Sequence, residues 1–502
     1  MLKFIKTMLL TGVASLFLSL TPAVAETLRV GVWDLPPGKG NPFTGRSVPS
    51  VFVWDAVFDP LVRISATGGP EAVLAKSWES VEPTRWRFVL KDGVSFSNGA
   101  PVNADAVVAT IEYLLTEEGR ASSVGGEVRN ISGVAKVNDM TVDIITSGPD
   151  PVLPNKLGLV FIVEPGAWAQ LGPEGFAETP VGTGAFKVAG WGTNEARLVA
   201  NKTSWRAPKI DGVTIVELPE RAARLQALLS DQIDVGFGFS PDNIGQIEAA
   251  GMKVAASAAP QVMSLAFATE ANPDSPFKDV RVRKAANLAV NRDLIAEVLL
   301  AGLGKGASQA GTSTAFGYDP SRSSYPYDPA QAKKLLAEAG YPDGFSATAH
   351  VVVGSFPADS EIYQQAAIDL AAVGIKLELQ QIRFPEWLGF FLKNTWPGEM
   401  FGSSWNTAPY MDTIRPYTYM TCAKRVPHFC DESMTPLFKA TFEEFNPEAR
   451  RGLLQKLHAK TMEVLPALFL VEQVDVTGVA ASVSGLSYIN RSVNYDAVTI
   501  SR

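Results

Sequence analysis

The sequence has few of the side chains that most often bind transition metals. Its 502 residues include 2 cysteines and 3 histidines, and His350, His428 and His458 are not spaced as metal ligands. The patterns H-E-x-x-H and G-x-S-x-G are absent. Residues 275–278 satisfy S-x-x-K, but no S-D-N or K-T-G accompanies them. We therefore expect no cofactor, no metal and no catalysis.

Positive charge is not in excess either. The chain carries 44 Lys and Arg against 52 Asp and Glu, a net charge of −8. Nucleic-acid-binding proteins meet phosphates with clustered basic residues, so the composition disfavours nucleic acid as a partner. A hydrophobic content of 46% over this length predicts a globular protein of two or three domains.

The two cysteines lie close together, at Cys422 and Cys430 in the segment TCAKRVPHFCD. An even pair this close in an exported protein is typical of a disulfide that closes a short loop. The alternative is a metal site that adds His428, for which a fourth ligand is missing. We therefore favour the disulfide.

A long apolar run is found only at the N-terminus. Lys3 and Lys6 precede the apolar stretch 8–20, and residues 23–25 (AVA) provide the small side chains of a cleavage site. This pattern predicts a secretory signal peptide over residues 1–25, and the alternative is a buried N-terminal helix. No cysteine lies near the cleavage site. We expect a periplasmic protein without a lipid anchor.

Apolar residues elsewhere repeat with the period of a helix in some segments and of a strand in others. Val282, Ala285, Ala286 and Ala289 follow Asp279 at helical spacing, which predicts a helix capped by Asp279.

A strand pattern is found earlier in the chain. Trp86, Phe88 and Leu90 alternate with Arg87 and Val89, which predicts a strand. The apolar spacing further on predicts a helix capped by Asn103. Helices and strands that follow one another along the chain indicate an α/β protein.

Residues 180–186 (PVGTGAF) place Gly182 and Gly184 close together. A phosphate-binding loop would need a helix start with Lys and Ser or Thr at fixed spacing, and neither follows. We predict that the glycines allow a tight turn into a strand that begins at Phe186.

Several segments resemble, in order, the motifs of the family 5 extracellular solute-binding proteins, which supply peptides, opines, sugars or nickel to ABC importers. The segments FKDVRVRKA and AVNRDLI, within 277–295, are similar to the family signature. Residues 327–341 (YDPAQAKKLLAEAGY) match a family motif almost letter for letter. Further similar segments are 74–115, 180–186, NKTSW at 201–205 and LQALLSDQIDV at 225–235.

The resemblance implies an α/β fold of the periplasmic-binding-protein type. In this fold two α/β lobes form a clamshell with an additional inserted domain (type II, large, cluster C-like). It implies that residues 26–69, 180–268 and 484–502 form lobe I, that 70–179 form the inserted domain II, and that 269–483 form lobe II (domain III).

The resemblance also implies a solute site in the cleft, where large flat side chains and a few fixed polar groups are needed. The main candidate segment is 401–415 (FGSSWNTAPYMDTIR). Trp405 and Tyr410 would stack on the solute, while Asn406 and Arg415 would supply hydrogen bonds or a carboxylate clamp. The other predicted contacts are Asp412, Arg383, Trp33 and Phe239. For each of them the alternative is an ordinary place in the core or in solvent.

Two departures from the family pattern bear on the solute. In peptide-binding members an aspartate three residues after the equivalent of Trp405 pairs with the amino terminus of the peptide, but Ala408 stands here. A buried ammonium without its counter-charge costs about 3–5 kcal/mol, so peptides with a free amino terminus are disfavoured. Ala268 replaces the asparagine of the family's aFN motif. A sugar-like, opine-like or modified-peptide solute is favoured, and Asp412 could take an amine or hydroxyls.

The resemblance thus implies a monomeric, periplasmic solute-binding protein. It would capture a peptide-like, opine-like or oligosaccharide solute and deliver it to the membrane permease of an ABC importer. The alternatives are an exported α/β hydrolase and a sensory receptor that uses the same clamshell. Binding without turnover would separate the first hypothesis from the hydrolase.

Overall fold

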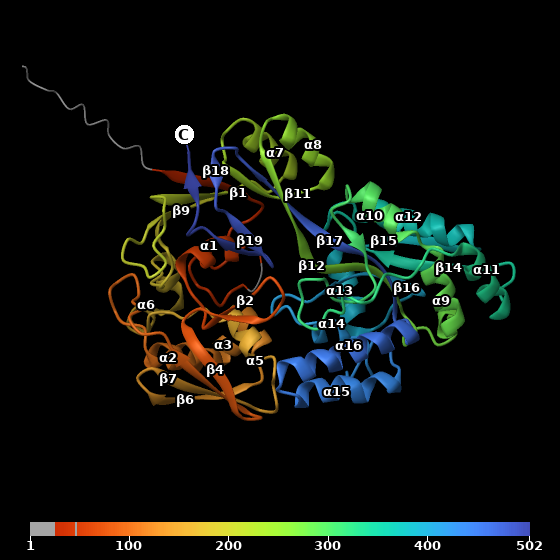
Figure 1. The fold of residues 1–502 in the computed structure, drawn as a ribbon, viewed down its shortest axis with the longest axis horizontal. Coiled ribbons are helices and arrows are strands. Elements are labelled where there is room, and N and C mark those ends of the chain that lie inside the picture. The colour runs from red at the N-terminus through yellow and green to blue at the C-terminus, as the bar shows by residue number, and fades with distance from the viewer. Residues whose placement is uncertain (1–25, 46–47, 502) are drawn as a thin grey trace, which may run out of the picture.

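The computed structural model describes residues 26–45 and 48–501, so the predicted signal peptide lies outside the described residues. Two α/β lobes lie side by side, and a smaller four-stranded domain packs beneath the first of them (Figure 1). The predicted clamshell with an additional domain is confirmed. Among the described residues, no helix combines the length and the apolar character needed to cross a membrane.

One sheet of 11 strands runs through both lobes. Its strands are β1 (Thr27–Val32), β8 (Phe186–Trp191), β9 (Glu195–Ala200), β10 (Gly212–Glu217), β11 (Val235–Phe239), β12 (Lys253–Phe267), β13 (Lys305–Gly306), β14 (Phe345–Val351), β15 (Ile375–Gln381), β16 (Met400–Asn406) and β17 (Ala467–Val479). They follow the order β15-β14-β16-β12-β17-β11-β1-β10-β9-β8, and β13 pairs with β17. β1 is parallel to β10 and β11, and β14 is parallel to β15 and β16. Such parallel pairs are typical of α/β layers.

The two longest strands, β12 and β17, join the lobes (Figure 1). In lobe I, residues 253–258 of β12 pair with the end of β17. In lobe II, residues 262–267 pair with the start of β17 and with β16. The register shifts between Ala258 and Val262, where both strands pass from lobe I into lobe II. Because both strands belong to both lobes, the domain boundaries predicted from the sequence stay predictions.

Domain II contains a second, antiparallel sheet with the order β4-β5-β7-β6. The strands of this part of the chain are β2 (Val62–Ile64), β3 (Pro70–Ala72), β4 (Ala75–Glu82), β5 (Arg85–Leu90), β6 (Ile131–Asn138) and β7 (Thr141–Thr146). Trp86, Phe88 and Leu90 alternate into the core, as predicted. The side chain of Asn103 accepts a hydrogen bond from the Ala106 amide and caps α2 (Ala104–Leu115).

Helices cover the sheets and the ends of the lobes (Figure 1). Lobe I and domain II contain α1 (Val51–Val57), α3 (Glu117–Ala121), α4 (Ser123–Glu127), α5 (Leu153–Lys156), α6 (Pro165–Glu178), α7 (Arg221–Leu229) and α8 (Ile244–Ala249). Lobe II contains α9 (Val280–Ala289), α10 (Arg292–Leu299), α11 (Pro329–Glu338), α12 (Asp359–Ala372), α13 (Phe384–Lys393), α14 (Ile414–Tyr417), α15 (Thr435–Glu443) and α16 (Pro447–Val464). The C-terminal strands, which return to lobe I, are β18 (Val483–Ser484), β19 (Ser487–Ile489), β20 (Ser492–Asn494) and β21 (Thr499–Ile500).

The predicted cap of α9 is confirmed. The Asp279 carboxylate accepts a hydrogen bond from the Arg281 amide at 2.8 Å, and it also pairs with the Arg281 guanidinium. The next arginine, Arg283, is buried and donates instead to backbone carbonyl oxygens, among them that of Val464 at 2.9 and 2.7 Å. This arginine therefore fixes the end of α16 against the start of α9.

Gly182 and Gly184 have a different role from the one predicted. Neither residue has a positive φ. A Cβ atom on Gly182 would lie 2.1 Å from the carbonyl oxygen of Val57, and one on Gly184 would lie 2.3 Å from that of Ala56. The loop is glycine-rich because it passes directly against the end of α1, not because it turns tightly.

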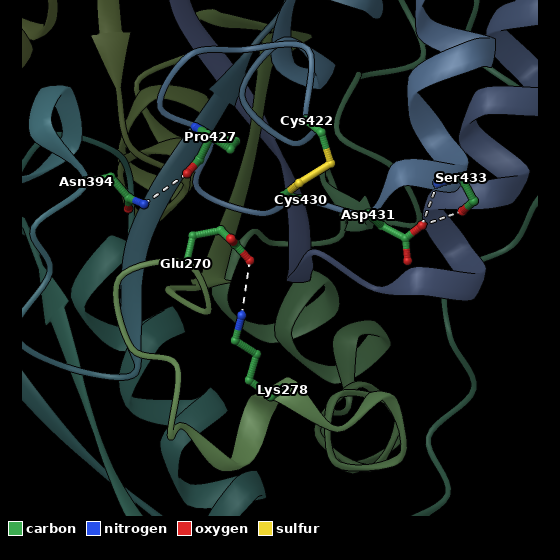
Figure 2. The surroundings of a disulfide bond; sticks show 8 residues. All are labelled: Glu270, Lys278, Asn394, Cys422, Pro427, Cys430, Asp431 and Ser433. Atoms are coloured by element: carbon green, nitrogen blue, oxygen red, sulfur yellow. Dashed lines mark hydrogen bonds and ion pairs between the residues drawn. A yellow bond between two sulfur atoms is a disulfide. The ribbon is translucent and has the colours of Figure 1, made fainter.

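The predicted disulfide is present between Cys422 and Cys430, with an S–S distance of 2.06 Å (Figure 2). The Asn394 side chain donates to the Pro427 carbonyl oxygen within the same loop at 2.9 Å, and His428 contacts Asn394 through Nδ1. Burial lowers the pKa of His428 to about 3. The alternative metal site that used both thiols and His428 is therefore wrong, since the two sulfur atoms bond each other.

Removing the disulfide should lower the stability of lobe II. The bridge closes a loop with a sequence separation of 8, for which loop-closure entropy predicts a loss of about 2–3 kcal/mol in the double variant Cys422→Ser/Cys430→Ser. Urea unfolding followed by tryptophan fluorescence measures this loss. A reducing agent should destabilise the wild type and leave the variant unchanged, and equal stability of both proteins would contradict the prediction.

Candidate functional site

A cavity of about 1070 Å³, its open mouth included, lies between the two lobes. Lobe I and domain II contribute Gly45, residues from the stretch 48–64 around α1, residues 158–161, Arg206, and residues 490–494 in the C-terminal segment. Lobe II contributes residues from the stretch 406–411, which begins at the last residue of β16. The charged side chains in its wall are Asp55, Asp59, Arg63, Arg206 and Arg491.

Arg206 and Asp59 form a buried pair in the floor of the cavity. Nε of Arg206 lies 3.0 Å from Asp59, and its Nη1 lies 3.0 Å from Asp496. Asp59 also accepts hydrogen bonds from Thr183 Oγ1 at 2.8 Å and from Trp205 Nε1 at 3.0 Å. This network ties the end of α1 to the C-terminal segment and leaves neither charge without a partner.

Arg491 is held by the strands that join the lobes. Its guanidinium pairs with Asp475 of β17 at 2.8 and 2.9 Å and donates to Gln261 Oε1 of β12 at 2.9 Å. The C-terminal segment that forms this wall of the cavity is therefore held against the two strands that join the lobes.

Asp55 of α1 has a less compensated environment. Its Oδ2 accepts hydrogen bonds from Ser492 Oγ and from the Val493 amide, both at 2.8 Å. Burial raises the pKa of the Asp55 carboxyl to about 6, although those hydrogen bonds and the charges of Arg206 and Arg63 act in the opposite direction.

Arg63 of β2 is the third arginine in the described wall of the cavity. Its side chain is half-buried, and in the part of the chain that the structure describes it forms no hydrogen bond or ion pair. A guanidinium in this position can accept a carboxylate from a solute.

The wall from lobe II carries no charge. Asn406, at the end of β16, accepts a hydrogen bond from the Ala408 amide through Oδ1 at 2.8 Å. Ala408, Pro409 and Met411 complete this side with apolar surface. Arg415 donates to the Asn406 carbonyl oxygen at 2.8 Å and so helps to hold the loop 406–411 in place.

Of the eight residues predicted as solute contacts, Asn406 lies in the wall of the cavity. Trp405, its neighbour on β16, is 3% exposed and packs in the core of lobe II. Successive side chains of a strand point to opposite faces, which explains the difference. The Trp405 Nε1 atom is buried, and among the described residues it has no hydrogen-bond partner.

Tyr410 and Asp412 are engaged within the protein. Tyr410 is half-buried, its carbonyl oxygen accepts from Asn155 Nδ2 at 2.8 Å, and burial raises the pKa of its hydroxyl. Asp412 is 1% exposed and pairs with Arg450 at 2.6 Å. It also accepts from the Ile414 amide at 2.9 Å. Asp412 therefore already has its counter-charge without a solute.

The other predicted contacts lie outside the wall of the cavity. Arg383 is exposed at the start of α13. Trp33 packs edge-on against Phe52, with 5.3 Å between the ring centroids. Phe239 is 1% exposed in the core. No bound solute tests these assignments, and they stay predictions.

Sequence reasoning missed most of the wall. Asp55 lies in α1 and Arg63 in β2, and neither was among the predicted contacts. Ser492 and Val493 lie near the C-terminus, hundreds of residues away. No local pattern marks these residues, because they meet only when the chain ends return to lobe I.

The lobes also touch each other beside the cavity. Asn155 of α5 donates to the carbonyl oxygens of Gly68 and Tyr410, at 2.7 and 2.8 Å. Arg415 lies 3.8 Å from Glu127 of α4. These contacts connect domain II to the loop of lobe II that lines the cavity.

Comparison with known proteins identifies the family. The profile of the bacterial extracellular solute-binding proteins, family 5 (middle region), matches residues 69–425. The chain belongs to this family. The resemblance found in the sequence is thereby confirmed. Family 5 proteins are substrate-binding proteins of ABC transporters and act in the periplasm or outside the cell.

Two curated relatives illustrate the range of the family 5 proteins. Heme-binding protein A of Haemophilus influenzae is 30% identical over 343 residues, 61% of this chain and 61% of that protein. The glutathione-binding protein GsiB of Pectobacterium atrosepticum is 28% identical over 314 residues, 61% of this chain and 60% of that protein. The chain thus spans about three fifths of the length of these relatives.

Solved family 5 structures share the fold over almost the whole chain. HbpA2 from Haemophilus parasuis superposes with a TM-score of 0.83 at 20% identity, covering 95% of this chain and 100% of that one. The periplasmic murein tripeptide binding protein MppA, in its unliganded open form, has a TM-score of 0.80 at 20% identity, with 95% and 98% covered.

The Asp412–Arg450 pair should contribute to stability and not to solute binding. Asp412→Ala leaves a buried guanidinium without its counter-charge, so we expect a loss of about 3–5 kcal/mol in urea unfolding. The double variant Asp412→Leu/Arg450→Met, which removes both charges, should recover most of this loss. If the double variant is stable and yet binds its solute more weakly, Asp412 is a solute contact after all.

Asp55 should make the free energy of unfolding decrease as the pH rises. Its carboxyl has a pKa of about 6 in the folded protein and about 3.9 when unfolded. Between these two pKa values the folded state holds more protons than the unfolded state. The free energy of unfolding therefore falls by about 1–3 kcal/mol as the pH rises through this interval. Asp55→Asn lacks this loss, so its stability relative to wild type should increase from about pH 4 to about pH 7. Urea unfolding at a series of pH values measures the difference, and a constant difference would contradict the assignment.

Proposed function

We propose that the protein captures a small solute in the cavity between its lobes and delivers it to the permease of an ABC importer. The observation that carries this proposal is the cavity itself, whose opposite walls come from lobes joined by β12 and β17. A solute that touches both walls binds the closed arrangement better than the open one, and so shifts the population toward it.

We propose that the lobes move at the point where β12 and β17 pass from one lobe into the other. The ladder between these strands shifts register between Ala258 and Val262, and again between Met263 and Ser264. Irregular pairing of this kind bends a strand and interrupts its hydrogen bonds. Movement there would carry the lobe II wall toward α1 while both lobes keep their cores.

We further propose that the protein binds its solute without changing it chemically. Among the described residues that line the cavity, the Ser492 hydroxyl donates to Asp55, but no histidine, lysine or cysteine is present to complete a catalytic group. Membership in a family of substrate-binding proteins supports this proposal.

We also propose where the protein acts, which surface meets the permease and where its domains begin. The protein acts as a monomer in the periplasm after removal of residues 1–25, without a lipid anchor. Its lobe II surface and its lobe I surface would both face the permease once the solute is enclosed. Residues 70–179 form the inserted domain, with lobe II beginning near residue 269.

Closure and release of an unchanged solute test the function. The mature protein, freed of bound small molecules by mild unfolding and refolding, is mixed with a small-molecule extract of bacterial cells. We expect its radius of gyration in X-ray scattering to fall, its thermal stability to rise, and the retained molecule to keep its mass over time. A shape and stability that never respond, or a retained molecule that is consumed, would contradict the proposal.

A further inference from the structure

One buried amide beside the cavity joins the two halves of the protein. Asn155 of α5 is 7% exposed, and its side-chain nitrogen donates to the carbonyl oxygens of Gly68 and Tyr410 at 2.7 and 2.8 Å. Gly68 belongs to the turn between β2 and β3, whereas Tyr410 belongs to the lobe II loop 406–411. The same amide therefore bonds one acceptor on each side.

The turn between β2 and β3 approaches lobe II more closely still. A Cβ atom on Gly68 would lie 2.1 Å from the Phe316 amide nitrogen and 2.7 Å from the Met411 carbonyl oxygen. These two lobe II atoms are hydrogen-bonded to each other at 2.8 Å, so neither can move aside without disturbing that bond. The lobes reach this separation because position 68 has no side chain.

The turn is held firmly on its own side. The Ser65 amide donates to the Gly69 carbonyl oxygen at 2.8 Å, and the Gly68 amide donates to that of Ser65 at 3.1 Å. The Asn490 side chain, from the C-terminal segment, donates to the Ser65 carbonyl oxygen at 2.6 Å. The turn therefore moves with lobe I, and its contact with lobe II depends on where lobe II lies.

Side chains of domain II and lobe II also interlock around α5. Val152, which precedes α5, is 2% exposed and belongs to the apolar core of lobe II. In the opposite direction, Phe445 of lobe II packs against the core of lobe I and domain II, and its ring centroid lies 5.8 Å from that of Trp86. Arg415 and Glu127 add a charged contact at 3.8 Å.

These contacts share one property. Each joins a residue in the first 155 positions to a residue beyond position 315, so each must break if the two lobes separate. The pairing of β12 with β17 need not break, because both strands belong to both lobes. The contacts are therefore specific to the closed arrangement and contribute to its population.

We propose that the β2–β3 turn and α5 form a clasp on the lobe II loop 406–411, and that this clasp determines how long the protein stays closed over its solute. The proposal deepens the proposed function and rests on it. Gly68 allows the two halves to meet, and Asn155 then bonds them. Both are positioning residues, because they act on the loop that lines the cavity. Domain II thereby has a role in retaining the solute.

Substitution of Gly68 tests whether the clasp is needed for closure. Gly68→Ala places a methyl group against Phe316 and Met411, so X-ray scattering should show a variant that no longer becomes compact in a small-molecule extract of bacterial cells. The matched control is Gly93→Ala. The φ angles are +79° at Gly68 and +76° at Gly93, but a Cβ atom on Gly93 has no neighbour within 4 Å. The control carries the same backbone strain and should close as the wild type does. A Gly68→Ala protein as compact as the wild type would overturn the proposal.

Substitution of Asn155 tests retention. The mature protein is loaded from the same extract and passed rapidly into buffer, and the return of its radius of gyration to the unloaded value gives the release rate. Asn155→Ala removes two hydrogen bonds of the closed form, so release should be about tenfold faster or more. The control is Asn272→Ala, whose amide donates to the carbonyl oxygens of Trp396 and Gly398 within lobe II, at 3.2 and 2.7 Å. This variant should lose stability and yet release at the wild-type rate. Equal release rates in the two variants would assign Asn155 a merely structural role and overturn the proposal.

Failure of the proposed function gives a different result. If the wild type never becomes compact in the extract, the proposed function fails and the clasp fails with it. If the wild type becomes compact while Gly68→Ala and Asn155→Ala behave as it does, the clasp alone is wrong.

Discussion

The antiparallel pairing of β12 and β17 is the constraint on which the rest of the structure depends. Each strand lies in both lobes, so the lobes share one sheet, and the cavity lies beside the point where both strands pass from one lobe to the other. The register of their ladder shifts between Ala258 and Val262, and again between Met263 and Ser264. Arg491 ties the C-terminal segment to this crossing through Asp475 and Gln261. The two lobes are thus joined where the pairing of the strands is irregular.

The same crossing determines how charge is arranged around the cavity. The return of the chain to lobe I brings Asp496 beside Arg206 and Ser492 beside Asp55. Buried ion pairs of this kind position segments more than they stabilise them, because desolvation offsets much of the attraction. Pairs of this kind hold Arg206 and Arg491 within the described wall, and few fixed polar groups are what a selective cavity needs.

Much of the fold could be predicted because its signals are local. Asp279 and Asn103 each cap a helix through a side chain that reaches an amide two or three residues ahead. The Cys422–Cys430 bridge closes a short loop and needs no distant partner. The candidate site was harder to predict. The segment 401–415 does reach the cavity, but strand alternation turns Trp405 into the core, and Asp412 meets Arg450, which is 38 residues away.

The sequence by itself determined the order of helices and strands, the disulfide loop and the family, since capping, periodicity and motif order are properties of neighbouring residues. The tertiary structure alone decided which charges meet in the wall of the cavity. Asp55 lies 438 residues from the amide that binds it. Whether a carboxylate or guanidinium is neutralised inside the protein depends on which distant segments meet around it, and no local pattern contains that information.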